Sequence, residues 1–129
     1  MLATRDKRKT VARLTKSSKI FKAIIQAIQE KKGSNIISLD LRKIPEAVAD
    51  FFIVCEADST TQVRAIANFI QEHVKNIAND TPFHSEGQQS AQWVLIDYVN
   101  VVIHVMLPET RKFYKLEEMW GDGGEQEHN

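Results

Sequence analysis

The chain has 129 residues, of which 43% are hydrophobic and 26% are charged, and its 17 basic residues balance 17 acidic ones. This length suits one domain around one core, and this composition is typical of a globular protein, which excludes the disordered and membrane-embedded classes. No apolar run approaches the roughly 20 residues that span a bilayer, and the N-terminus lacks the apolar region of a secretory signal.

Basic residues dominate the start of the chain: from Arg5 to Lys22 the only acidic residue is Asp6. We predict that residues 1–16 form a flexible basic arm, which either contacts nucleic acid or is a solvated leader. The arm could also pass for a mitochondrial transit peptide, but Asp6 and the lack of amphipathic spacing favour the bacterial cytoplasm. Cys55 is the only cysteine, which excludes an intrachain disulfide and a CxxC metal site and fits a reducing compartment.

The first half of the chain predicts two helices and two strands. A helix is expected over residues 17–32, where isoleucines recur at helical spacing before Gly33 ends it. Strands are expected over 36–41 and 50–56, separated by a loop over 42–47. The second strand is almost continuously apolar, which indicates a central position in the sheet. Ser59 and Gln62 then form a capping-box pattern that begins a second helix, which residues 79–82 end. Its predicted buried stripe is Val63, Ile66, Ala67, Ile70, Val74 and Ile77.

A short edge strand over 83–86 precedes two apolar runs that flank Val99 and Asn100 and predict a β-hairpin. A two-residue loop sets the register. One face carries the pairs Tyr98–Val101, Ile96–Ile103 and Val94–Val105, which we assign to the core. The other face carries Asp97–Val102, Leu95–His104 and Trp93–Met106. A carboxylate and an imidazole among large apolar side chains indicate either a contact surface or a face that a helix covers, where the two polar groups satisfy each other.

Pro108 opens a last helix that we expect to reach Met119. Its spacing places Phe113, Leu116 and Trp120 on one stripe and Arg111, Tyr114 and Glu117 on the neighbouring one. Residues 122–129 are predicted to be a disordered acidic tail. The element order predicts the α/β class: a single domain over 17–121 in which helices flank a mixed five-stranded sheet.

Three kinds of chemistry can be weighed from the residues. A nucleotidyltransferase needs two metal-binding carboxylates after a Gly-Ser turn, but Gly33-Ser34 and Asp40 are followed by Arg42, which would repel the metal. Cys55, His104 and Asp97 could form a nucleophilic triad, although Cys55 lies in a buried strand pattern. The four histidines lack the close spacing of metal ligands. We therefore predict no catalytic activity, no metal site and no cofactor.

An ordered series of motifs carries a family resemblance. The motifs are Asp50-Phe-Phe-Ile-Val, Ser59, Val63 with Ala65-Ile66-Ala67, Glu86-Gly87, Trp93-Val-Leu-Ile-Asp97-Tyr98, Val102-Ile103-His104-Val105, Arg111, Phe113-Tyr114, Leu116-Glu117 and Trp120. Over residues 17–122 the chain resembles the ribosomal silencing factor family, which is also called Iojap-like. It departs from the family at the hairpin turn, where Val99-Asn100 replaces the usual Gly-Asp, and in its longer basic leader.

The resemblance implies a translation regulator without catalytic activity and with a nucleotidyltransferase-like fold that lacks the catalytic carboxylates. Members of the family dock on the large-subunit ribosomal protein numbered fourteen, block joining of the small subunit when nutrients are scarce, and form homodimers when free. The expected contact residues here are Trp93, Leu95, Asp97, His104, Arg111, Tyr114, Glu117 and Trp120. Two alternatives stay open: a vestigial nucleotidyltransferase that binds a nucleotide, and an RNA-binding module that uses the basic arm.

Overall fold

The structure is a computed structural model that describes residues 15–16, 18–121 and 124–129. Residues 1–14 of the predicted basic arm therefore lie outside the described residues. The elements are α2 (Lys19–Glu30), β1 (Ser34–Asp40), β2 (Phe51–Glu56), α3 (Thr60–Ala78), β3 (His84–Glu86), β4 (Trp93–Asp97), β5 (Val101–Met106), α4 (Pro108–Tyr114), α5 (Leu116–Trp120) and β6 (Glu125–Glu127).

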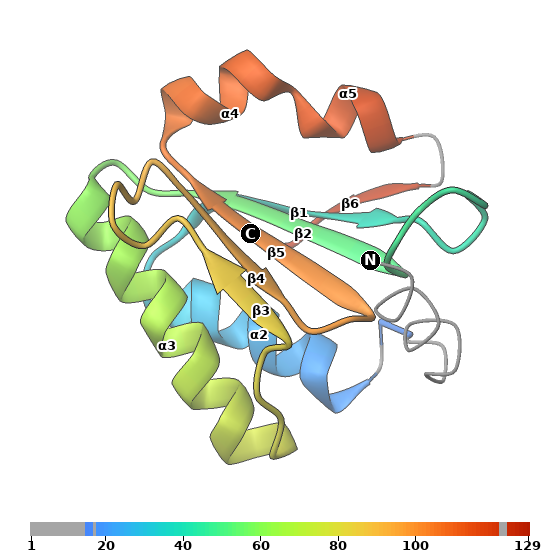
Figure 1. The fold of residues 1–129 in the computed structure, drawn as a ribbon, viewed down its shortest axis with the longest axis horizontal. Coiled ribbons are helices and arrows are strands. Elements are labelled where there is room, and N and C mark those ends of the chain that lie inside the picture. The colour runs from blue at the N-terminus through green and yellow to red at the C-terminus, as the bar shows by residue number, and fades with distance from the viewer. Residues whose placement is uncertain (1–14, 17, 122–123) are drawn as a thin grey trace.

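The strands form one mixed sheet in the order β3-β4-β5-β2-β1-β6. The central strands β2 and β5 run parallel, whereas the other neighbours pair antiparallel. Helices α2 and α3 cover one face of the sheet, and α4 and α5 cross the other face (Figure 1). The predicted α/β class, the mixed sheet and the central, buried position of β2 are confirmed.

The sheet has six strands and not the predicted five, because part of the tail pairs with β1. The sequence predicts disorder over 122–129, whereas the structure places Glu125–Glu127 in strand β6. Backbone groups hold this strand: the His128 amide donates to the Ile36 carbonyl and the Asp40 amide donates to the Gly124 carbonyl, both at 2.8 Å. All three residues of β6 are polar and exposed, so the sequence has no alternating apolar pattern that predicts a strand here.

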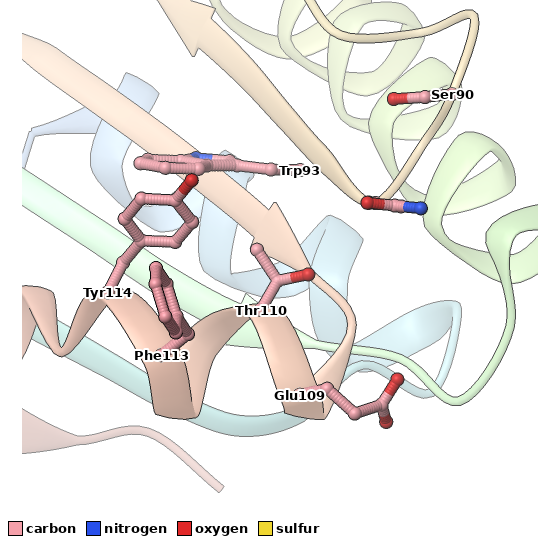
Figure 2. A pocket seen from close by; sticks show the side chains of 7 residues that line it. Ser90, Trp93, Glu109, Thr110, Phe113 and Tyr114 are labelled. Atoms are coloured by element: carbon pink, nitrogen blue, oxygen red, sulfur yellow. The ribbon is translucent and has the colours of Figure 1, made fainter.

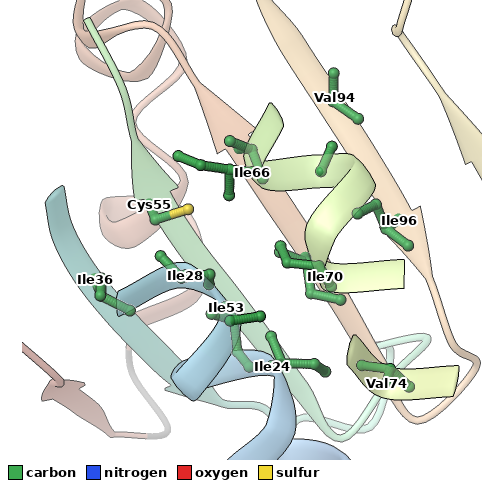
Figure 3. Close-up of a cluster of buried hydrophobic side chains, with 14 of the residues drawn as sticks. Ile24, Ile28, Ile36, Ile53, Cys55, Ile66, Ile70, Val74, Val94 and Ile96 are labelled. Atoms are coloured by element: carbon green, nitrogen blue, oxygen red, sulfur yellow. The ribbon is translucent and has the colours of Figure 1, made fainter. Parts of the chain in front are cut away.

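The main core lies between the sheet and the pair α2–α3 (Figure 3). Its fully buried side chains include Ile24, Ile28, Ile53, Ile66, Ile70, Val94, Ile96 and Ile103. The stripe predicted for α3 is confirmed from Val63 to Val74, but Ile77 in the last turn is 47% exposed. Ser59 begins α3 as predicted: its hydroxyl accepts a hydrogen bond from the Gln62 amide at 3.1 Å.

The hairpin has the predicted register, with Trp93 opposite Met106, Leu95 opposite His104 and Ile96 opposite Ile103. Its turn is the predicted two-residue loop, since the Tyr98 amide donates to the Val101 carbonyl at 2.9 Å. Val99 takes a φ of 76°, a left-handed conformation that is unfavourable for a β-branched side chain. The Asp97 carboxylate accepts from the Val99 amide at 2.7 Å and thereby stabilises the turn.

The predicted last helix is two helices, because Lys115 takes a left-handed conformation with a φ of 50°. Its amide still bonds to the Arg111 carbonyl, which closes α4 before α5 starts at Leu116. The break places Leu116 against the sheet while Phe113 points away from it: Leu116 is buried and Phe113 is 78% exposed. The prediction that both share one apolar stripe is wrong.

Candidate functional site

Helices α4 and α5 cover the second face of the hairpin, which had two predicted interpretations. A second apolar cluster fills the space between these helices and the sheet, with Leu39, Leu41, Phe52, Val54, Val102, Met106 and Leu116 among its buried members. The covering-helix interpretation is therefore the one observed. The two polar groups on this face do not pair with each other as that interpretation supposes, because Asp97 bonds to the turn and His104 bonds to Trp93.

The contact between Trp93 and His104 orients the largest aromatic side chain of this face. The indole Nε1 of Trp93 donates to Nδ1 of His104 at 3.0 Å, so the proton of the neutral imidazole sits on Nε2. His104 is 4% exposed, and this burial lowers its pKa to about 4. His104 is therefore a neutral acceptor at physiological pH that fixes the indole ring.

Three aromatic side chains form a continuous surface at the edge of this face, which we call the aromatic surface: Trp93, Phe113 and Tyr114. The rings of Trp93 and Tyr114 lie 4.7 Å apart, and those of Tyr114 and Phe113 lie 5.0 Å apart. Phe113 is 78% exposed and Tyr114 is 48% exposed. An apolar patch of large rings in contact with water is typical of a binding surface.

The aromatic surface forms one wall of an open pocket of about 350 Å³ (Figure 2). Its polar lining is Ser90 and Gln92 from the loop before β4, and Glu109 and Thr110 from the first turn of α4. Arg64 of α3 holds this loop, since its guanidinium donates to the carbonyls of Gln88 at 2.9 Å and Gln89 at 2.6 Å. A concave apolar centre with a polar rim suits a protein side chain or loop as its ligand.

Two residues predicted as direct contacts, Arg111 and Glu117, bond within the protein. Arg111 is 7% exposed, and its Nε donates to the Glu117 carboxylate at 3.2 Å. Its Nη1 donates to the Asn35 carbonyl at 2.6 Å and to the Glu56 carboxylate at 3.2 Å. Each of these partners belongs to a different element, so Arg111 joins α4 to β1, β2 and α5.

The other predicted contact residues divide by burial. Asp97 and His104 are buried, whereas Leu95 and Trp120 are half-buried at the margin of the second cluster. The ring of Trp120 lies edge-on to Phe52, with their centroids 5.9 Å apart. The structure thus brings all eight predicted residues to the α4–α5 side of the sheet, but it exposes only some of them.

Sequence reasoning missed Phe113 as an exposed residue of this site. Its spacing from Leu116 indicated a shared buried stripe, and only the break at Lys115 separates the two. Lysine carries no preference for a left-handed conformation, so the sequence held no local signal for this break. The sequence predicts the neighbouring Tyr114 as a contact because it occurs with Arg111 and Trp120, residue types that are favoured at interfaces, and the structure leaves Tyr114 48% exposed.

The candidate catalytic groups are not arranged for catalysis. Asp40 is held by Arg42 through two hydrogen bonds of 3.0 and 2.7 Å, and this guanidinium lowers the pKa of the carboxyl. Cys55 belongs to the core on the α2–α3 side, whereas His104 packs on the other face, so the imagined triad does not assemble. Burial also raises the pKa of the Cys55 thiol to about 12, which leaves it uncharged at neutral pH.

Within residues 15–16, 18–121 and 124–129, no three His, Cys, Asp or Glu side chains are grouped so that they could hold a metal ion. The helices in the same part of the chain are all too short or too polar to cross a bilayer.

Comparison with known proteins gives consistent matches. A silencing factor of Chromobacterium violaceum, named "Ribosomal silencing factor RsfS", is 42% identical over 102 residues, which cover 79% of this chain and 82% of that protein. A crystal structure of a protein from the same organism superposes with a TM-score of 0.75 at 42% identity and covers 79% of this chain and 83% of that one. The mouse protein "Mitochondrial assembly of ribosomal large subunit protein 1" is 33% identical over 73 residues, which cover 55% of this chain and 32% of the mouse protein.

The match to the family itself spans all of the described residues. The family described as "Ribosomal silencing factor during starvation" matches residues 14–129, from just before α2 to the end of the chain. The resemblance carried by the aromatic, Arg111 and Glu86-Gly87 motifs is thereby confirmed. This chain belongs to the ribosomal silencing factor (RsfS) family.

Proposed function

We propose that this protein represses translation by binding the large ribosomal subunit and keeping the small subunit from joining it. Membership of the silencing factor family supports the activity, and the name of the mouse relative supports the large subunit as the partner. The single observation that carries the proposal is the aromatic surface, because Phe113 and Tyr114 expose rings that no element of the described fold covers.

The binding site that we propose on the ribosome is the large-subunit protein numbered fourteen, at the face where the two subunits meet. Trp93 and Tyr114 are the central anchors, and Leu95 and Trp120 extend the contact along the margin of the second cluster. Four further residues of the site bond within the fold and hold the contact residues in position: Asp97, His104, Arg111 and Glu117. Truncation of one such anchor to alanine weakens the binding free energy by about 2 kcal/mol or more, which is a factor of about thirty in affinity.

Repression by occlusion requires no chemistry from the bound protein. A domain seated at the intersubunit face excludes the small subunit by its volume, and the blocked fraction follows from its concentration relative to its dissociation constant. The Asp40–Arg42 pair agrees with this reading, since a carboxylate neutralised by arginine is a poor metal ligand. We propose the bacterial cytoplasm as the location of this activity, a homodimer as the free form and ribosomal RNA as a contact of the basic arm.

Sedimentation of purified large and small subunits tests the proposal. With the protein added under ionic conditions that allow joining, we expect it to migrate with the large subunit and the joined ribosome peak to decline. Trp93→Ala and Tyr114→Ala should each weaken both effects, whereas Ile77→Ala, which changes an exposed apolar side chain of α3, should not. A protein that stays at the top of the gradient while joining proceeds would refute the proposal.

A further inference from the structure

Helix α4 is unusual because its only buried side chain is an arginine. The helix has seven residues, and an isolated helix of this length is unstable in water. Phe113 and Tyr114, which end it, expose much of their rings and so add little burial to hold it. The contacts of Arg111 must therefore supply much of what fixes α4 on the sheet.

A distortion of β1 provides one of these contacts. The pairing of β1 with β2 is irregular between Ser34 and Ile37, and within this irregularity Asn35 takes a left-handed φ of 50°. A bulge of this kind turns a backbone group away from the regular ladder. The Asn35 carbonyl accepts from Arg111 Nη1 at 2.6 Å, so the bulge supplies an acceptor to the helix above it.

The Glu117 contact spans the break between the two helices. Glu117 lies in the first turn of α5, on the far side of the left-handed Lys115 from Arg111. The 3.2 Å bond between Arg111 Nε and the Glu117 carboxylate therefore fixes the direction in which α5 leaves α4. Glu56 at the end of β2 accepts from the same guanidinium at 3.2 Å and ties the junction to the centre of the sheet.

We propose that Arg111 is a positioning residue for ribosome binding: it anchors α4 so that Phe113 and Tyr114 complete the aromatic surface with Trp93, and it does not itself touch the ribosome. The inference rests on the proposed function for the identity of the ligand. It differs from the expectation that Arg111 and Glu117 are direct contacts, because Nε and Nη1 of this guanidinium donate to acceptors within the fold and the side chain is 7% exposed.

Three variants of the full chain separate positioning from contact. Arg111→Met removes the guanidinium and leaves the carboxylates of Glu56 and Glu117 without their cation. Arg111→Lys keeps the charge but loses the planar fork that reaches several acceptors at once. Arg42→Met is the matched control, because it removes an arginine from the Asp40 ion pair instead.

Each variant is measured in two ways. Affinity for purified large subunits reports binding, and nuclear Overhauser effects between the Trp93 indole and the Tyr114 ring report the geometry of the aromatic surface, since these rings lie 4.7 Å apart in the native fold. We expect Arg111→Met to weaken binding about tenfold or more and to weaken these effects. Arg111→Lys should reduce the affinity and the Trp93–Tyr114 effects less than Arg111→Met does. Arg42→Met should leave the affinity and these effects unchanged.

A double mutant sharpens the test. If Arg111 acts through the aromatic surface, Arg111→Met combined with Tyr114→Ala binds no more weakly than the worse of the two single variants. Additive losses, or a loss of affinity in Arg111→Met with the Trp93–Tyr114 effects intact, would show that Arg111 contacts the ribosome and would overturn the inference. Unchanged affinity and unchanged effects would overturn it as well.

The geometric measurement keeps this inference distinct from the proposed function. If the wild-type chain fails to bind large subunits, the proposed function is wrong, while weakened Trp93–Tyr114 effects in the Arg111 variants still establish that Arg111 sets the surface. If Arg111→Met does not fold, Arg111→Lys and its control give the same two measurements.

Discussion

Trp93 and His104 lie diagonally across β4 and β5, and the indole nitrogen of Trp93 donates to the imidazole of His104 at 3.0 Å. This bond links an exposed aromatic surface to a buried titratable group. Protonation of Nδ1 would place two donors face to face, so the native arrangement requires the neutral imidazole. The contact gives the fold a specific sensitivity to acid.

The first prediction concerns this sensitivity. Burial lowers the pKa of His104 from 6.5 to about 4. At a pH between these two values, the imidazole is protonated in the unfolded chain and neutral in the native protein, so the proton favours unfolding. The contribution of the neutral His104 to the free energy of unfolding is complete above pH 6.5 and is lost as the pH falls toward 4. The loss is roughly 3 kcal/mol, because each pKa unit corresponds to about 1.36 kcal/mol.

Urea unfolding across pH 4–7 tests this prediction. The free energy of unfolding should decline less for His104→Asn than for the wild type. His84→Asn, at an exposed position of β3, should keep the wild-type decline; parallel curves for wild type and His104→Asn would contradict the assignment.

The second prediction separates binding from stability at Phe113. Because this ring is 78% exposed, Phe113→Ala should change the free energy of unfolding by less than about 0.5 kcal/mol. The same change should weaken large-subunit binding about tenfold or more, since it removes one ring of the aromatic surface. Ile77→Ala is the matched control on the opposite side of the sheet. A Phe113→Ala protein that binds like the wild type would remove Phe113 from the site.

The third prediction concerns Gly87, which precedes the loop that lines the pocket. Its φ is 94°, and a Cβ at this position would lie 2.0 Å from the backbone oxygen of Trp93. Gly87→Ala should therefore lower the free energy of unfolding by about 3 kcal/mol or more, because the backbone at Trp93 must move to make room for the Cβ. Thermal or urea unfolding measures this change. Gly121→Ala should be nearly neutral, since the nearest atom to its added Cβ is 3.8 Å away on a flexible glutamate. Equal effects of the two changes would count against the close approach at Gly87.

The fourth prediction is a stabilising change at the hairpin turn. Val99 holds a φ of 76°, which a β-branched side chain adopts only at a cost, whereas glycine adopts it freely. Val99→Gly should raise the free energy of unfolding by about 1 kcal/mol, with the Asp97 bond to the turn amide retained. Asn100→Gly serves as the comparison, because Asn100 is not among the positive-φ residues and should gain nothing from the change. A destabilised Val99→Gly protein would mean that side-chain packing outweighs the backbone cost.

Much of the fold follows from local patterns in the sequence. The hairpin register could be predicted because alternation assigns Val94, Ile96 and Tyr98 to the core side and the two-residue loop then fixes which residues pair. The start of α3 could be predicted because Ser59 and Gln62 interact within one turn of helix. In both places the residues that determine the structure lie close together in the chain.

The features that escaped prediction depend on distant partners. Strand β6 has the sequence Glu-Gln-Glu, which lacks β-forming residues and pairs only because β1 offers an open edge. The burial of Arg111 depends on Asn35 and Glu56, which lie 76 and 55 residues away in the chain. The aromatic surface was only partly anticipated for the same reason: the conformation of Lys115, which turns Phe113 outward, is set by how α4 and α5 pack on the sheet.

Strand β6 also bears on how copies of this protein behave at high concentration. Without it, β1 would border the sheet with an unpaired row of amides and carbonyls, a template onto which another chain can add. With it, the outermost strand presents Glu125 and Glu127 to solvent, and two copies that approach along this rim bring like charges together. The last six residues, which form and flank β6, thus protect the sheet against edge-to-edge growth into fibres. A version of the protein shortened before Gly124 should precipitate where the full chain stays dissolved.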